Sequence, residues 1–193
     1  MGREISYQEK DTEKFRLLYA ELGLPEPNQD QTQEFKSVYR AAYRASRRAT
    51  PGSIETLAGL KRAGWRLAIV TNGQTADQID KAEAIGVANF IEVIITSEDM
   101  NMAKPNARIF DATLDALNAG ACWSFVVGDD LKADIQGAIN QGILSPIWYN
   151  PMAEAKKIEF SQREVTVIRD MRELLPMLCM NPLIAQLHSF RLS

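Results

Sequence analysis

From about residue 51 onward, the sequence alternates short, continuous apolar segments with longer amphipathic segments, and this alternation constrains the fold more than any other feature. Continuous apolar strands are typical of parallel sheets that carry helices on both faces. The pattern therefore predicts an α/β fold of this kind. The expected strands are 66–72, 91–97, 124–129, 145–149 and 164–168, and the expected helices are 53–63, 75–85, 106–118 and 133–141.

The first fifty residues contain no convincing strand and predict two amphipathic helices. The first covers about residues 7–22, and the second runs from a cap at Asp30 or Thr32 to about residue 48. Thr50, Pro51 and Gly52 mark a boundary. We therefore expect a helical segment over 1–50, an α/β core over 51–178 and a tail over 179–193. The expected inner stripe of the second helix is Phe35, Val38, Tyr39, Ala42 and Tyr43.

The charge balance argues against a polyanionic partner. The 193 residues carry a formal net charge of −3, so we expect no nucleic-acid partner. The basic cluster of Arg40, Arg44, Arg47 and Arg48 lies at helical spacing and is interpreted as a solvated face. No apolar run is long enough to span a bilayer, so we expect no membrane partner and a cytoplasmic location. Residues 1–6 fit a myristoylation pattern, which we attribute to chance.

Cysteine and histidine are too scarce and too scattered for several kinds of site. Cys122 and Cys179 form no Cys-x-x-Cys pair, and the single histidine, His188, lies near the end of the chain. These positions argue against a zinc site and against Cys-His or Ser-His catalysis. For the two cysteines we expect buried free thiols rather than a disulfide.

Polar residues follow two of the expected strands. Thr71, Asn72 and Gly73 end one strand just before a helix, where backbone N–H groups and the positive helix end favour a phosphate. Ordinary turn chemistry explains the same three residues equally well. Lys104 precedes Pro105 between a strand and a helix, and taken alone it would be a solvated charge.

Three carboxylates gather at the end of a later strand. Asp129 and Asp130 follow Gly128, and Asp134 comes one helical turn further on. Clustered carboxylates require a counter-cation, and oxygen ligands at a phosphate site favour Mg²⁺. The alternative is structural, with Asp129 or Asp130 capping the next helix and Asp134 complementing its dipole.

Taken in order, these residues resemble the haloacid dehalogenase superfamily of phosphohydrolases. The second family motif corresponds to Ile69–Gly73, the third to Lys104–Pro105 and the fourth to Gly128–Asp134. The resemblance covers about residues 51–178 and implies a Rossmann-like sheet. Within the superfamily, the sequence is most similar to the branch of pyrimidine 5′-nucleotidases and small-metabolite phosphatases.

The resemblance also implies roles for these residues. Thr71 would hold the phosphoryl group with Asn72 and Gly73, and Lys104 would neutralise charge beside it. Asp129 and Asp134 would hold Mg²⁺, while the role of Asp130 stays open. The implied activity is Mg²⁺-dependent hydrolysis of a small phosphorylated metabolite or nucleotide.

The family's first motif, Asp-x-Asp, supplies the nucleophile, and it occurs nowhere in this sequence. The helices before Pro51 resemble part of the family's helical cap, so we expect a sheet without its central first strand. Three explanations are open: a gene fragment or misplaced start, a pseudoenzyme, or an unrecognised nucleophile. In the pseudoenzyme, a homo-oligomer partner, another protein or the tail over 179–193 fills the gap, and the module binds phosphate or metal without catalysis.

Overall fold

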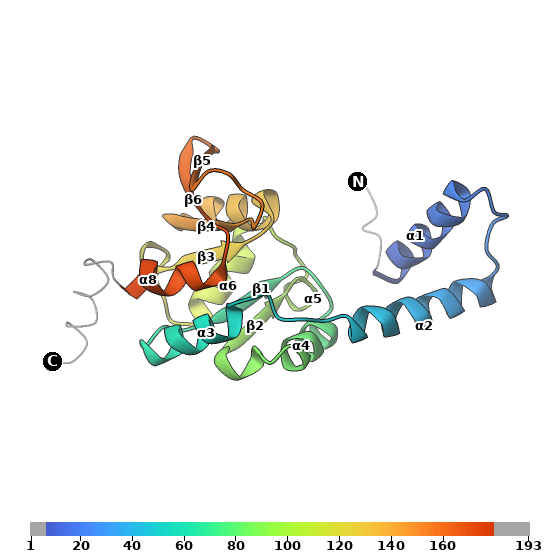
Figure 1. The fold of residues 1–193 in the computed structure, drawn as a ribbon, viewed down its shortest axis with the longest axis horizontal. Coiled ribbons are helices and arrows are strands. Elements are labelled where there is room, and N and C mark those ends of the chain that lie inside the picture. The colour runs from blue at the N-terminus through green and yellow to red at the C-terminus, as the bar shows by residue number, and fades with distance from the viewer. Residues whose placement is uncertain (1–6, 180–193) are drawn as a thin grey trace. The chain divides into compact units, whose positions relative to one another are not determined.

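The computed structural model describes residues 7–179 (Figure 1). The chain divides after Arg47 into two compact units. The expectations for residues 1–6, His188 and most of the tail lie outside the described residues.

The first unit consists of helices α1 (Tyr7–Glu21) and α2 (Gln29–Ala45), close to the expected bounds. The expected cap at Asp30 or Thr32 is wrong, because Asn28 caps α2. The Asn28 side chain accepts a hydrogen bond from Gln31 N at 2.9 Å, and Asn28 N donates to Gln31 Oε1 at 3.0 Å. This reciprocal pair satisfies two backbone donors at the start of the helix.

Aromatic stacking joins the two helices. Phe15 is 4% exposed and stacks on Phe35 with ring centroids 4.0 Å apart. The expected inner stripe is otherwise wrong, because no residue of α2 is buried and Val38, Tyr39 and Tyr43 are exposed. Among the described residues of this unit, α2 packs against α1, and Phe15 of α1 stacks on Phe35.

The second unit contains all five expected strands and one more. Its order is α3 (Ser53–Arg62), β1 (Ala68–Thr71), α4 (Thr75–Ala84), β2 (Val93–Thr96), α5 (Ser97–Met100), α6 (Ala107–Ala116), β3 (Phe125–Gly128), a π turn (Leu131–Ile135), α7 (Gln136–Asn140), β4 (Ser145–Tyr149), β5 (Lys157–Phe160), β6 (Arg163–Ile168) and α8 (Leu174–Cys179). Short 3₁₀ turns occur at Ala88–Phe90, Ala121–Trp123 and Met171–Glu173.

The strands form two sheets. β1 pairs with β2 in parallel, and the second sheet has the order β3-β4-β6-β5 with parallel pairs except for β5. Within residues 7–179, no strand pairs with the other edge of β1 or of β3. The expected α/β fold with parallel strands and helices is confirmed.

Helices cover both faces of these strands. On one face, α3 and α8 contribute Leu60 and Leu174 to a core that also contacts Leu67 and Phe125. On the other face, Ile109 of α6 and Ala138 of α7 pack with Val70 and Val126. Residues at β1 and at β3 therefore share the same two cores, although the strands do not pair.

Strand β5 was missed from the sequence. It alternates polar and apolar residues at an edge and joins β6 through Ser161 and Gln162, whose φ angles are 50° and 60°. Positive φ at both residues of a two-residue turn is usually met by Asn-Gly or Gly-Gly. Ser-Gln carries no such signal, so the hairpin could not be recognised.

The prediction of buried thiols is wrong. Cys122 and Cys179 are both free, as expected, but both are exposed. Cys122 lies in a 3₁₀ turn before β3. On α8, Leu174 and Leu178 are buried, and Cys179 is the next residue along the helix, so its side chain lies off the buried face.

Within the part of the chain that is described, no helix is long and apolar enough to cross a membrane.

Candidate functional site

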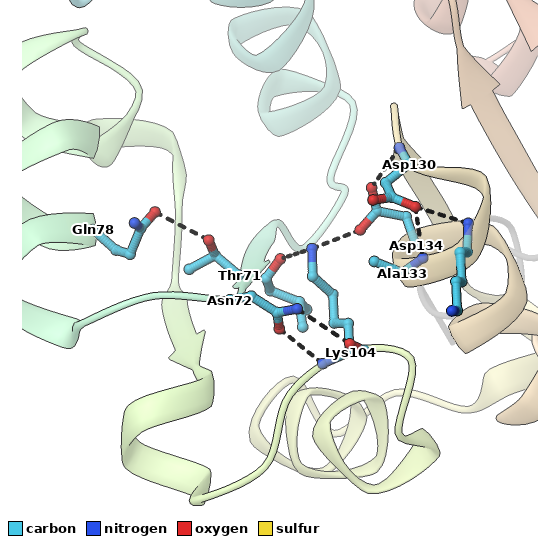
Figure 2. Close-up of polar contacts among 9 residues, drawn as sticks. Thr71, Asn72, Gln78, Lys104, Asp130, Ala133 and Asp134 are labelled. Carbon is cyan, nitrogen blue, oxygen red and sulfur yellow. Dashed lines mark hydrogen bonds and ion pairs between the residues drawn. The ribbon is translucent and has the colours of Figure 1, made fainter. Parts of the chain in front are cut away.

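The end of β1 holds the first predicted group of residues. Thr71 is half-buried, and its hydroxyl donates to Gln78 Oε1 of α4 at 3.0 Å (Figure 2). Gly73 is buried, and its N–H donates to Ser97 Oγ at 3.0 Å. A hydroxyl and a tight glycine turn therefore lie directly before α4, as the sequence predicted.

Residues after β2 secure the start of α4. Thr75 N donates to Glu98 Oε2 at 2.8 Å, and Thr75 Oγ1 donates to Asp99 Oδ1 at 2.7 Å. Thr75 Oγ1 also lies 2.7 Å from Oγ1 of the buried Thr96. Carboxylates at a helix N-terminus complement its dipole. This support from 96–99 holds the 71–75 turn in place.

Lys104 is anchored through its main chain. Lys104 N donates to Asn72 Oδ1 at 2.8 Å, and Asn72 Nδ2 donates to Lys104 O at 3.1 Å. Both polar atoms of the Asn72 side chain therefore hold the lysine loop beside β1 (Figure 2). The suggested phosphate role of Asn72 stays a prediction.

The Lys104 side chain joins the two predicted clusters. Its Nζ donates to Val70 O of β1 at 3.0 Å and to Asp134 Oδ1 at 2.6 Å. The two ion-paired side chains are only 13% and 9% exposed. The structural alternative of a solvated lysine is therefore wrong.

The three carboxylates after β3 have different environments. Asp130 Oδ1 accepts from Lys132 N and Ala133 N, each at 2.8 Å, and these backbone donors lower the pKa of Asp130. Asp134 Oδ2 accepts from Asp130 N at 3.1 Å, so both oxygens of Asp134 have partners. The side chain of Asp130 thus acts as a helix cap, the structural role that the sequence left open.

Asp129 is the open carboxylate of the three. The residue is exposed, and its main-chain carbonyl oxygen accepts a hydrogen bond from Trp148 Nε1 at 2.9 Å. The described residues bring no three His, Cys, Asp or Glu side chains into a group that could hold a metal ion. Mg²⁺ commonly uses one or two carboxylates, several waters and a substrate phosphate. Asp129 fits that requirement, whereas Asp134 already pairs with Lys104 and would have to interact with the ammonium and the metal ion together.

Gly128 begins the segment that resembles the fourth motif, but no role of its own was assigned to it from the sequence. A Cβ at this position would lie 2.3 Å from Asp134 Cβ and Oδ2, closer than atoms can approach. The absence of a side chain therefore lets Asp134 pack against the end of β3. Gln78, Ser97 and Glu98 were also not assigned roles, since their contacts depend on how α4 and α5 meet.

A family model described as haloacid dehalogenase-like hydrolase matches residues 7–146. The chain belongs to this family. The expectation drawn from the motifs is thereby confirmed, and the match includes the helical residues before Pro51 as well as the α/β residues up to Pro146.

Three relatives of this chain are named phosphatases or a nucleotidase. It is 33% identical over 129 residues to a glyceraldehyde 3-phosphate phosphatase of Methanothermobacter thermautotrophicus, covering 66% of this chain and 57% of that protein. It is 32% identical to a ribulose-1,5-bisphosphate 5-phosphatase of Halopiger xanaduensis, covering 78% and 62%. It is 36% identical to the pyrimidine 5′-nucleotidase YjjG of Escherichia coli, covering 52% and 44%. The chain thus spans less than two thirds of each relative.

Solved structures share the fold. YfnB from Bacillus subtilis, whose structure is bound to magnesium, matches with a TM-score of 0.75 at 24% identity over 90% of this chain and 73% of that one. A HAD phosphatase from Thermococcus onnurineus matches with a TM-score of 0.61 at 22% identity, covering 88% and 91%. At these identities the likeness concerns the fold alone.

Proposed function

We propose that this chain binds the phosphate group of a phosphomonoester together with Mg²⁺. The phosphomonoester is a small phosphorylated metabolite or a nucleotide. The observation that carries the proposal is the partly buried Lys104 ammonium, which lies 3.0 Å from Val70 O and 2.6 Å from Asp134 Oδ1. A cation in that place can neutralise a phosphoryl group at Thr71, the residue after Val70. The names of the curated relatives support the substrate class.

Each residue then has a defined task. Thr71 donates its hydroxyl to a phosphoryl oxygen, and Lys104 offsets the negative charge spread over the other oxygens. Asn72 keeps the lysine loop beside β1 through its two hydrogen bonds to Lys104. Asp129 and Asp134 would hold Mg²⁺, which neutralises phosphate charge when bound.

Hydrolysis needs a nucleophile that the sequence does not contain in the family form. No Asp-x-Asp occurs among the 193 residues. We therefore expect negligible turnover by this chain alone, and activity only when another segment or subunit supplies an apolar strand that ends in Asp-x-Asp. The unpaired edges of β1 and β3 within the described residues are compatible with such a strand.

Phosphate release and phosphate binding test different parts of this proposal. Calorimetry with inorganic phosphate and Mg²⁺ should show saturable binding that Asp129→Ala weakens and Asp115→Ala, an exposed carboxylate on α6, leaves unchanged. Release of phosphate from sugar phosphates and nucleotides should be negligible until a strand ending in Asp-x-Asp is fused to the chain. Mg²⁺-dependent turnover by the unfused chain, abolished by Asp129→Ala, would overturn the conclusion that this chain lacks a nucleophile. Absence of phosphate binding would overturn the proposed site.

A second candidate function is a non-catalytic phosphate-binding or regulatory module. The absence of Asp-x-Asp favours it, because the binding groups do not need the nucleophile to hold an anion. Saturable phosphate binding, with no turnover even after the strand is fused, would select this function.

A further inference from the structure

The hydroxyl assigned to phosphate already has an acceptor within the protein. Thr71 Oγ1 donates to Gln78 Oε1 at 3.0 Å, and Gln78 is the fourth residue of α4. Figure 2 shows the Gln78 side chain reaching from the helix toward Thr71, on the side away from Lys104. A hydroxyl has a single hydrogen to donate, so a phosphoryl oxygen and the Gln78 carbonyl must compete for it.

The position of Gln78 over the turn is tight. A Cβ at Gly73 would lie 2.5 Å from Gln78 Nε2, so the glutamine amide occupies the space beside the buried glycine. The neighbouring donors are also satisfied internally, since Gly73 N donates to Ser97 and Thr75 N to Glu98. The turn therefore has a complete set of internal partners at Thr71, Gly73 and Thr75.

We propose that Gln78 is a displaceable internal acceptor that sets the phosphate affinity of Thr71. A bound phosphoryl oxygen takes the place of the Gln78 carbonyl at the Thr71 hydroxyl. The exchange favours phosphate because a hydrogen bond to a charged oxygen is stronger than one to a neutral amide. This inference rests on the proposed role of Thr71 in holding phosphate, and it makes Gln78 a positioning residue that acts through Thr71.

Two substitutions of similar length should change the affinity in opposite directions. Gln78→Met removes the competing carbonyl, so inorganic phosphate should bind about three- to tenfold more tightly, the worth of one neutral hydrogen bond. Gln78→Glu supplies a charged competitor and repels phosphate, so binding should weaken by about tenfold or more. A direct phosphate ligand at position 78 would instead make both substitutions weaken binding.

The measurement is calorimetric titration of the full 193-residue chain with inorganic phosphate at constant Mg²⁺, with thermal unfolding of each variant as a check on folding. Gln74 provides the matched control, because it is exposed and makes no side-chain cap hydrogen bond at the start of the same helix. Gln74→Met should leave the affinity within about twofold of wild type. Gln74→Glu should weaken binding less than Gln78→Glu.

Thr71→Val separates this inference from the proposed function. The inference predicts that Gln78→Met has no effect in the Thr71→Val background, because the competition requires the hydroxyl. Phosphate binding that Thr71→Val leaves unchanged overturns the role of Thr71 and the inference built on it. Binding that Thr71→Val weakens and Gln78→Met also weakens overturns the inference alone. Absence of binding in every variant overturns both.

Discussion

Lys104 Nζ lies 2.6 Å from Asp134 Oδ1, and this buried ion pair connects the lysine loop to the turn after β3. The same ammonium donates to Val70 O of β1 at 3.0 Å. Lys104 therefore links β1 and the end of β3, two strands that belong to separate sheets among the described residues. The pair should contribute to the cohesion of the α/β unit as well as to its candidate chemistry.

Removing one member of this pair should strongly destabilise the fold. Lys104→Met leaves the Asp134 charge without its partner, and Asp134→Leu does the same to Lys104, so each should lower the free energy of unfolding by about 3–5 kcal/mol. The double variant should recover much of that loss, because no unpaired charge remains. Urea denaturation of the four proteins measures both effects.

The exposed pair of Lys157 and Glu164, 2.7 Å apart with side chains 60% and 65% exposed, is the matched control. Solvent screens this pair, so Lys157→Met should change the free energy of unfolding by no more than about 1 kcal/mol. Equal effects of Lys104→Met and Lys157→Met would contradict the importance of the buried pair.

Gly128→Ala should disturb Asp134 directly. The added Cβ would lie 2.3 Å from Asp134 Cβ, so the backbone or the aspartate must move and the pair with Lys104 must loosen. We expect a loss of about 1–3 kcal/mol in the free energy of unfolding. Gly120→Ala is the control, because its Cβ would meet Trp123 Cδ1 at an ordinary 3.6 Å. Equal stability of the two variants would show that the end of β3 relaxes freely.

Asp130 should matter to stability through its cap. Asp130→Ala removes the acceptor of the Lys132 and Ala133 N–H groups and should lower the free energy of unfolding by about 1 kcal/mol. Asp130→Asn keeps a side-chain oxygen and should be nearly neutral. Urea denaturation at neutral pH distinguishes these outcomes, and a loss in Asp130→Asn as large as in Asp130→Ala would indicate that the charge rather than the cap is needed.

Asp170 should make stability depend on pH in the acid range. The Arg172 guanidinium and backbone N–H lower the pKa of Asp170 to about 2. An unfolded aspartate has a pKa of about 3.9, so the stabilisation is present above about pH 4 and is lost as the pH falls through about 2. Thermal unfolding should therefore show Asp170→Asn melting below wild type at pH 7, with a difference that shrinks toward pH 2. A difference that is constant with pH would contradict this assignment.

Thr71 and Asp129 could be found from the sequence because each lies at the end of an apolar strand. Thr71 comes at the end of β1 and Asp129 directly after β3, so their approximate placement needs only the strand pattern. The partner of Thr71 could not be found in this way. Gln78 reaches it only because α4 begins at Thr75 and turns this side chain back over Gly73.

Some sequence patterns do not settle a residue's role or burial, and the fold was needed to decide them. Asp130 could bind metal or cap a helix, and the N–H groups of Lys132 and Ala133 make it a cap. The amphipathic pattern of α2 predicted a buried stripe, but an apolar face is buried only where another element covers it, and no residue of α2 is buried although Phe35 stacks on Phe15.

By itself, the sequence determined the α/β order of elements, the family and the motif residues, because hydrophobic period and residue type along the chain carry that information. It also established that Asp-x-Asp is absent from these 193 residues. Only the tertiary structure decided that Lys104 pairs with Asp134, that Asn72 holds the lysine loop and that Gln78 accepts the hydrogen bond of the Thr71 hydroxyl. These contacts join separate elements through single side-chain atoms, and their geometry depends on packing that local patterns do not specify.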